Sequence, residues 1–150
     1  MKNAAINEIL TEKGFLLADG ATGTNLFMRG LETGYPPELW NVERPDDIQG
    51  LHASFFDAGS DLVLTNSFGG NALRLKLHDA QDRVPELNAA AARLARKAAA
   101  TATDRQRRPL LVAGSMGPTG ELFEPVWKRR KGSQRSCFFA PRLRDHATAI

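Results

Sequence analysis

The sequence predicts an α/β fold on three observations. Short continuous apolar runs occupy residues 15–18, 62–64 and 110–113, as expected for parallel strands covered on both faces. The runs begin 47 and 48 residues apart, which leaves room for a helix in each interval. Each run leads directly into small and polar residues, which are typical of loops at strand ends. Alternating strands and helices of this kind form parallel sheets with right-handed crossovers.

The first element is expected to be a short helix before the first apolar run. Apolar side chains recur there at Ile6, Ile9 and Leu10, and Gly14 is placed to end the helix. This helix is expected to pack across the start of the first strand.

Two longer helices are expected between the runs. The first begins at residues 45–47, where a proline precedes two carboxylates that favour the positive end of the helix dipole, and Gly59 ends it. Its apolar face comprises Ile48, Leu51, Phe55 and Ala58. The second covers residue 85 to about residue 102, and its apolar face comprises Leu87, Ala91, Leu94, Ala95 and Ala98.

The composition suits one soluble globular unit. The 150 residues are 42% apolar and 25% charged, with a net charge of +3 that is too mild to indicate a nucleic-acid partner. No apolar run approaches the roughly 18 residues of a membrane span, and the first residues lack the apolar core of a secretory signal. The single cysteine, Cys137, excludes an internal disulfide and a cysteine-based zinc cage, and it favours a reducing cytoplasm.

The charge balance changes abruptly after Val126. Up to that residue the chain has 13 Lys and Arg and 16 Asp and Glu, a net charge of −3. Residues 127–150 have 7 Lys and Arg and the single acid Asp145, a net charge of +6, and they show no apolar period. Two interpretations are open, a basic tail that binds nucleic acid or an anionic surface, and a frameshifted coding segment.

The loops after the runs do not match nucleotide-binding motifs. The loop at 19–24 begins with an acid that would repel a pyrophosphate, and the loop at 114–120 lacks a P-loop lysine and contains Pro118. Other loop residues carry two interpretations each. Asp19 could bind a substrate ammonium or accept bonds from its own turn, and Trp40 could be a lid over the site or a loop anchor in the core. Arg74, Lys76 and His78 are expected on a solvated face.

The length bears on the architecture. A doubly wound sheet can be completed in about 150 residues, whereas a (β/α)8 barrel typically needs about 250. The pattern alone therefore favours a doubly wound sheet.

Four segments, in this order, closely resemble the start of the homocysteine S-methyltransferase family, and most closely its bacterial betaine–homocysteine methyltransferase-like branch. They are residues 17–26, 37–41, 58–70 and 113–121, and the resemblance covers about residues 8–126. It implies that the chain holds about three βα units of a (β/α)8 barrel, in place of the doubly wound sheet. It also implies methyl transfer from a small donor, betaine or similar, to the thiol of homocysteine, giving methionine.

The resemblance also implies a site. Homocysteine-binding residues would be Asp19, Gly20, Thr65, Asn66, Ser67, Phe68, Gly114 and Ser115, and Trp40 would close over the methyl donor. The family uses a zinc ion held by three cysteine thiolates, which keeps the substrate sulfur nucleophilic. Betaine-using animal relatives have a tyrosine where this chain has Gly69 and Gly70, which argues against betaine as donor.

The departures from the family concern catalysis. The zinc-binding cysteines lie late in the barrel, Cys137 matches none of them, and the acid after the fourth strand is missing. The resemblance stops at Val126, where the charge changes, and this favours two segments: residues 1–126 as the start of the barrel domain and residues 127–150 as a frameshifted or disordered tail. The chain is therefore expected to be a truncated form that is inactive alone. The alternatives are a non-enzymatic partial α/β binding module with a basic tail and a complete small α/β binding protein.

Overall fold

The computed structural model describes residues 4–119, so the prediction of a separate tail at 127–150 lies outside the described residues. The described part is mixed α/β, with a parallel sheet of β1 (Leu62–Leu64) and β2 (Leu111–Ala113). Leu62 lies opposite Leu111, and Leu64 lies opposite Ala113. The predicted α/β class and the second and third predicted strands are confirmed.

The first apolar run joins the sheet through one residue. Ala18 forms a parallel bridge to Leu62, and the Asp19 N–H donates to the Leu62 carbonyl at 3.0 Å. The segments therefore lie in the order Ala18, β1, β2. Phe15 and Leu17 are 59% and 47% exposed, so the expectation that this run is covered on both faces is wrong for the described residues. Among the residues that the structure describes, this run is bonded to β1 on one edge.

The predicted helices are present. α1 (Ala4–Lys13) ends at Gly14, whose φ is +78°. α4 (Pro45–Asp57) begins at the predicted proline, and α6 (Val84–Gln106) extends beyond the predicted end near residue 102. α6 stops at Arg107, which takes a left-handed conformation with φ of +58°.

Several short helices in the loops escaped prediction because they are too short to show an apolar period. They are α2 (Thr22–Met28), η1 (Pro37–Leu39), α3 (Trp40–Glu43), α5 (Ala72–Leu75), η2 (Lys76–His78) and η3 (Gln81–Arg83). No helix among residues 4–119 is both long and apolar enough to cross a bilayer.

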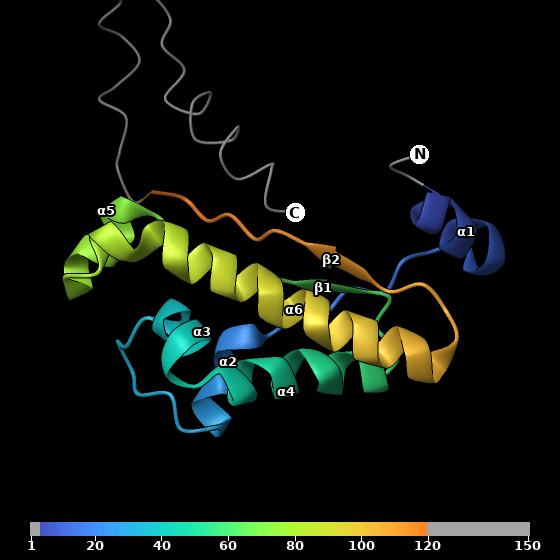
Figure 1. The fold of residues 1–150 in the computed structure, drawn as a ribbon, viewed down its shortest axis with the longest axis horizontal. Helices are drawn as coiled ribbons and strands as arrows, with labels where there is room; N and C mark the ends of the chain where they lie inside the picture. The colour runs from blue at the N-terminus through green and yellow to red at the C-terminus, as the bar shows by residue number, and fades with distance from the viewer. Residues whose placement is uncertain (1–3, 120–150) are drawn as a thin grey trace, which may run out of the picture.

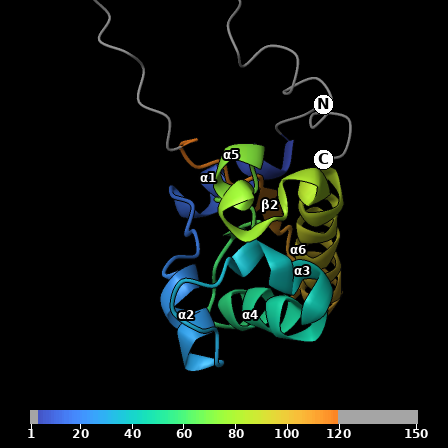
Figure 2. The same ribbon diagram turned by 90° about the vertical axis from the view of Figure 1, so that its left-hand side faces the viewer.

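α4 and α6 form one layer against the sheet (Figure 1). Phe56 of α4 and Val63 of β1 are fully buried against small residues of α6, among them Ala95 and Ala98. The alanines allow helix and sheet to approach closely. Figure 2, which looks along the layer, shows α2 and α4 on the same side of the strands.

The two ends of the layer differ. α1 lies beside the amino ends of the strands, whereas α5 lies beside their carboxyl ends (Figure 1). At the amino end the fully buried Asp61 binds Lys13 of α1 at 2.5 Å, Arg108 beyond α6, and the Leu17 N–H at 3.0 Å. Burial raises the pKa of Asp61, but the hydrogen bonds from Lys13 and Leu17 and the charges of Lys13 and Arg108 outweigh it and hold the pKa below its ordinary value. One carboxylate thus joins α1, β1 and the end of α6.

Candidate functional site

A cavity of about 510 Å³ lies at the carboxyl ends of the strands. Its walls come from the loop after Ala18, the loop before α3, the ends of β1 and β2, and α5 with η2. The lining residues are Gly20–Gly23, Gly34–Glu38, Leu64–Asn66, Phe68, Gly69, Arg74, Leu75, Leu77, His78 and Ser115. Ligands of parallel α/β folds bind beyond the carboxyl ends of the strands, so this cavity is the candidate site.

Five of the predicted site residues line this cavity: Gly20, Thr65, Asn66, Phe68 and Ser115. They come from all three strand ends, which lie 45 or more residues apart in the sequence. The other four predicted residues, Asp19, Trp40, Ser67 and Gly114, are not among the lining residues.

The hydroxyl groups at the end of β1 form a closed ring of hydrogen bonds with the end of β2. The Ser115 N–H donates to Thr65 Oγ1 at 3.0 Å, and Ser67 Oγ donates to the Ser115 carbonyl at 2.8 Å. The Ser67 proton is used in that bond, so Thr65 is the donor in the 2.7 Å bond between the two hydroxyls. The hydroxyl protons of Thr65 and Ser67 are therefore both used in hydrogen bonds within the fold. These bonds hold the end of β1 against the end of β2.

Asn66 is tied to the loop before α4. Its Nδ2 donates to the Pro37 carbonyl at 2.8 Å and to Asn41 Oδ1 at 3.0 Å. Asn41 Nδ2 in turn donates to the carbonyls of Asn66, at 2.8 Å, and Leu87. Both amides are buried and their donors are satisfied, so this pair holds one wall of the cavity rigid.

Glu38 is a functional candidate that sequence reasoning missed. Its side chain is buried, lines the cavity, and accepts the Gly69 N–H at 2.6 Å. A Cβ atom at Gly69 would lie 2.8 Å from Glu38 Oε1, so the position requires glycine while Glu38 stays in place. The sequence did contain a signal for this role, because Glu38 is an acid between Pro37 and Leu39 in an otherwise apolar segment.

Asp19 is used within the fold. Its Oδ1 accepts the Leu64 N–H at 3.1 Å, at the end of β1. Burial raises the pKa of Asp19, and this backbone bond partly offsets the rise. The carboxylate thus shapes the strand end beside the cavity.

Trp40 is 5% exposed and packs with Leu26, Leu31, Ile48 and Leu51. The Arg44 guanidinium lies 4.0 Å from the centre of its ring. This placement is that of the loop anchor, the second of the two interpretations open for Trp40, and it does not support a lid over a methyl donor.

The outer wall of the cavity adds polar groups that the sequence assigned to solvent. Arg74 and His78 are exposed, as expected, yet they border the cavity together with Tyr35. Their position depends on how η2 folds back beside α5, which no local pattern reveals.

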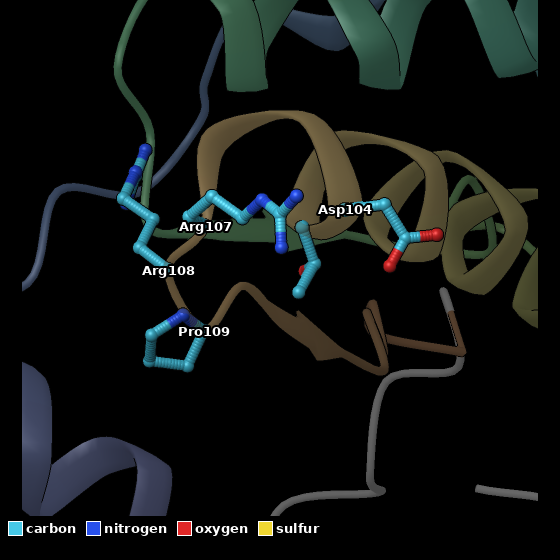
Figure 3. A pocket seen from close by; sticks show the side chains of 5 residues that line it. Asp104, Arg107, Arg108 and Pro109 are labelled. Carbon is cyan, nitrogen blue, oxygen red and sulfur yellow. The ribbon is translucent and has the colours of Figure 1, made fainter.

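A second cavity, of about 570 Å³, lies at the opposite end of the molecule and is lined by Thr103, Asp104, Arg107, Arg108 and Pro109. Figure 3 shows the side chains of Asp104 and Arg108 pointing away from each other. Arg108 is engaged by Asp61 and by the Ser60 carbonyl at 3.0 Å. Arg108 is thus held by partners within the fold, so this cavity is the weaker candidate.

Residues 4–119 contain no group of three or more His, Cys, Asp or Glu side chains placed to hold a metal ion. Cys137 lies outside the described residues. The described residues therefore do not fit a metal centre with three thiolate ligands.

The family model for homocysteine S-methyltransferase matches residues 16–147. The match extends past Val126, where the motif comparison placed its limit, and includes most of the basic segment.

Individual relatives of the chain support the same family. The chain is 36% identical over 125 residues to methionine synthase of Mycobacterium tuberculosis, covering 77% of this chain and 10% of that protein. It is 36% identical over 129 residues to homocysteine S-methyltransferase of Escherichia coli, covering 79% of this chain and 40% of that protein. The chain thus spans well under half the length of these relatives.

Solved structures of the homocysteine methyltransferase MmuM from Escherichia coli match the described fold. The metallated form gives a TM-score of 0.65 at 30% identity, covering 76% of this chain and 41% of that one. The oxidized form gives a TM-score of 0.67 at 31% identity, covering 79% and 42%. The fold thus matches part of a (β/α)8 barrel protein, as the sequence resemblance implied.

Proposed function

Because the chain belongs to the homocysteine S-methyltransferase family, we propose that it forms the homocysteine-binding part of an enzyme that methylates the homocysteine thiol, giving methionine. The observation that carries the proposal is the cavity at the carboxyl ends of the strands. Five of the residues expected to bind homocysteine line it, and they come from three separate strand ends. The relatives and the family model support the same assignment.

The charges of the cavity suit an amino acid. Homocysteine has an ammonium and a carboxylate, and the cavity offers the Glu38 carboxylate and the Arg74 guanidinium. We assign the ammonium to Glu38 and the carboxylate to Arg74. Asp19, which accepts the Leu64 N–H, would shape the pocket from behind.

The hydroxyl ring would act as scaffold. Thr65, which lines the cavity, has no free hydroxyl proton to donate, so a substrate can contact only the lone pairs of its oxygen. Direct donors would come from the backbone of Gly20–Gly23, at the start of α2, where the glycines permit close approach.

The second substrate would be a small methyl donor. Gly69 and Gly70 lie against the side chains of Glu38 and Asn88, so this wall has no room for a tyrosine ring unless those side chains move. Because betaine-using relatives have a tyrosine at this position, the absence of room for one favours a donor other than betaine.

The metal of the family would act as a Lewis acid that keeps the homocysteine sulfur as a thiolate. The described residues do not fit this metal, and no step is assigned to it. We place the protein in the cytoplasm, in keeping with its single cysteine.

The test is homocysteine binding by the full chain, measured calorimetrically for Glu38→Gln and for the exposed control Glu32→Gln. Gln can still accept the Gly69 N–H, so the fold should persist while the negative charge is lost. Loss of a charge-assisted hydrogen bond should weaken binding about tenfold or more in Glu38→Gln, and the control should bind as the wild type does.

A ligand comparison sharpens the assignment. 4-Mercaptobutanoate lacks the ammonium, so it should bind the wild type more weakly than homocysteine does. In Glu38→Gln the preference for homocysteine should disappear. Absence of homocysteine binding by the wild type, or equal behaviour of the two variants, would refute the proposal.

A further inference from the structure

Asn88 lies near the start of α6, and its side chain reaches the loop that follows β1. Its Nδ2 donates to the Gly70 carbonyl at 2.8 Å. The two residues are packed closely, because a Cβ atom at Gly70 would overlap Asn88 Oδ1. Within residues 4–119 that Oδ1 atom is buried and has no hydrogen-bond partner, so the side chain is tied to the fold through the bond to Gly70. Asn88 is not among the residues that line the candidate site.

The loop after β1 is a tight turn. The Gly70 N–H donates to the Ser67 carbonyl at 3.0 Å, and the Asn71 N–H donates to the Gly69 carbonyl at 2.8 Å. Residues 67–71 are thus bonded to one another. A group that fixes the carbonyl of Gly70 therefore also fixes the peptide group of its neighbour Gly69.

Gly69 in turn holds the acid of the candidate site. Its N–H donates to Glu38 Oε1 at 2.6 Å, and the Glu38 side chain is buried. A short bond of this kind to a carboxylate is strong, so the position of the Gly69 N–H sets the direction in which Glu38 points. The hydrogen bonds therefore run from Asn88 through the glycine turn to Glu38.

The start of α6 is a fixed point from which this turn is held. Leu87, the residue before Asn88, is fully buried and packs with Leu39 and Leu75. The Leu87 carbonyl also accepts Asn41 Nδ2 at 3.3 Å. Because its neighbour is held by packing and by this bond, Asn88 has a defined position relative to the cavity wall.

We propose that Asn88 is a positioning residue for recognition of the substrate ammonium. Through Gly70 it holds the turn at 67–71, and that turn orients the Glu38 carboxylate. The inference rests on the proposed function, because Glu38 is the group assigned to the ammonium of homocysteine. Asn88 acts from outside the cavity, so its removal should lower selectivity for the ammonium without removing a group that contacts the substrate.

The test compares Asn88→Ala with the control Gln106→Ala in the full chain. Gln106 lies at the other end of α6, where its Nε2 donates to the Phe56 carbonyl at 3.0 Å. Each substitution thus removes a bond from an amide side chain of α6 to a distant backbone carbonyl, but Gln106 has no connection to the glycine turn. Urea unfolding measures the loss of stability in each variant.

The first measurement needs no ligand. A short hydrogen bond to a carboxylate shifts an amide proton downfield, so the NMR signal of the Gly69 N–H reports its bond to Glu38. In Asn88→Ala we expect this signal to move upfield and its hydrogen exchange to become about two- to tenfold faster. In Gln106→Ala both should stay as in the wild type. An unchanged Gly69 signal in a folded Asn88→Ala chain would overturn the proposal.

The second measurement is the preference for homocysteine over 4-mercaptobutanoate, which lacks the ammonium. Asn88→Ala should reduce this preference by about two- to tenfold, and Gln106→Ala should keep it. In a double variant with Glu38→Gln, the preference should fall no further than in Glu38→Gln alone, because Asn88 acts through Glu38.

Two results of the binding measurements would overturn the proposal. One is an unchanged preference in Asn88→Ala, as a purely structural role would give, and the other is additive losses in the double variant. Absence of homocysteine binding by the wild type would refute the proposed function alone, because the Gly69 signal still tests whether Asn88 positions Glu38.

Discussion

His52 is a buried ionisable side chain that the proposed function does not use. It lies on α4 with 1% of its surface exposed, and neither ring nitrogen has a hydrogen-bond partner among the described residues. Burial lowers the pKa of His52 from 6.5 to about 4. The folded state therefore disfavours the charged ring, and its stability is present above pH 6.5 and lost as the pH falls from 6.5 toward 4.

We expect the free energy of unfolding to fall by about 2 to 3 kcal/mol between pH 7 and pH 4.5 because of this group. His52→Leu should abolish most of that fall, and it should cost little at pH 7 because no hydrogen bond is lost. Urea unfolding at the two pH values measures the difference, with exposed His78→Leu as control. An unchanged pH dependence in His52→Leu would show that the ring is not the group that titrates.

Two glycines of the site region differ in what surrounds them. A Cβ at Gly117 would lie 2.5 Å from the Phe68 carbonyl, whereas at Gly23, inside α2, it would meet nothing within 4 Å. Gly117→Ala should therefore destabilise the protein by about 1 to 3 kcal/mol through overpacking. Gly23→Ala should stabilise it by about 0.5 to 1 kcal/mol, because alanine favours the helix. The denaturant midpoints of the two variants, each compared with that of the wild type, measure these opposite changes in stability. Equal midpoints for the two variants would contradict the prediction.

At the scale of elements, prediction from the sequence worked where a signal was local. Prolines and acids at their starts predict where α4 and α6 begin, and the spacing of apolar residues predicts their buried faces. Both helices are present. The prediction of the first strand failed because, among the described residues, that run pairs with β1 through the single bridge of Ala18 to Leu62, and no local pattern shows how far two distant segments pair. The polar residues Glu38 and Asn41 were missed because their partners, Gly69 and Asn66, are distant in the sequence.

The Asp61 carboxylate joins α1, β1 and the segment after α6, so a substitution there tests how strongly these elements are held together. Asp61→Asn leaves Lys13 and Arg108 without their common anion and should cost about 3 kcal/mol. The control is Asp57→Asn, since the pair of Asp57 with Arg105 is half exposed and should contribute less than about 1 kcal/mol. Hydrogen exchange should also show α1 opening first in Asp61→Asn. Equal losses in the two variants would contradict the role given to Asp61.

At the scale of the whole molecule, the family and the fold class were predicted correctly from ordered motifs, and five of nine site residues lie in one cavity. Trp40 could not be placed in advance because a lid and a core anchor require the same residue type. The prediction that residues 127–150 are a frameshifted tail stays a prediction. The family model matches through residue 147, and translation of the other two frames of the coding DNA beyond the codon of Gly114 would test it.

The last prediction concerns catalysis by the chain alone. A three-thiolate metal centre needs three cysteines, and the sequence has one. Without such a centre the homocysteine thiol, with an ordinary thiol pKa of about 8.5, is mostly protonated at neutral pH and a poor nucleophile. We therefore expect the purified chain to produce no methionine above the rate without protein, with betaine or another small methyl donor and with zinc added. Escherichia coli homocysteine S-methyltransferase, assayed in parallel, provides the positive control. Methionine formation that persists after removal of zinc by a chelator would show that this chain activates the thiol by groups of its own, and the cavity around Glu38 would then be the place to look for them.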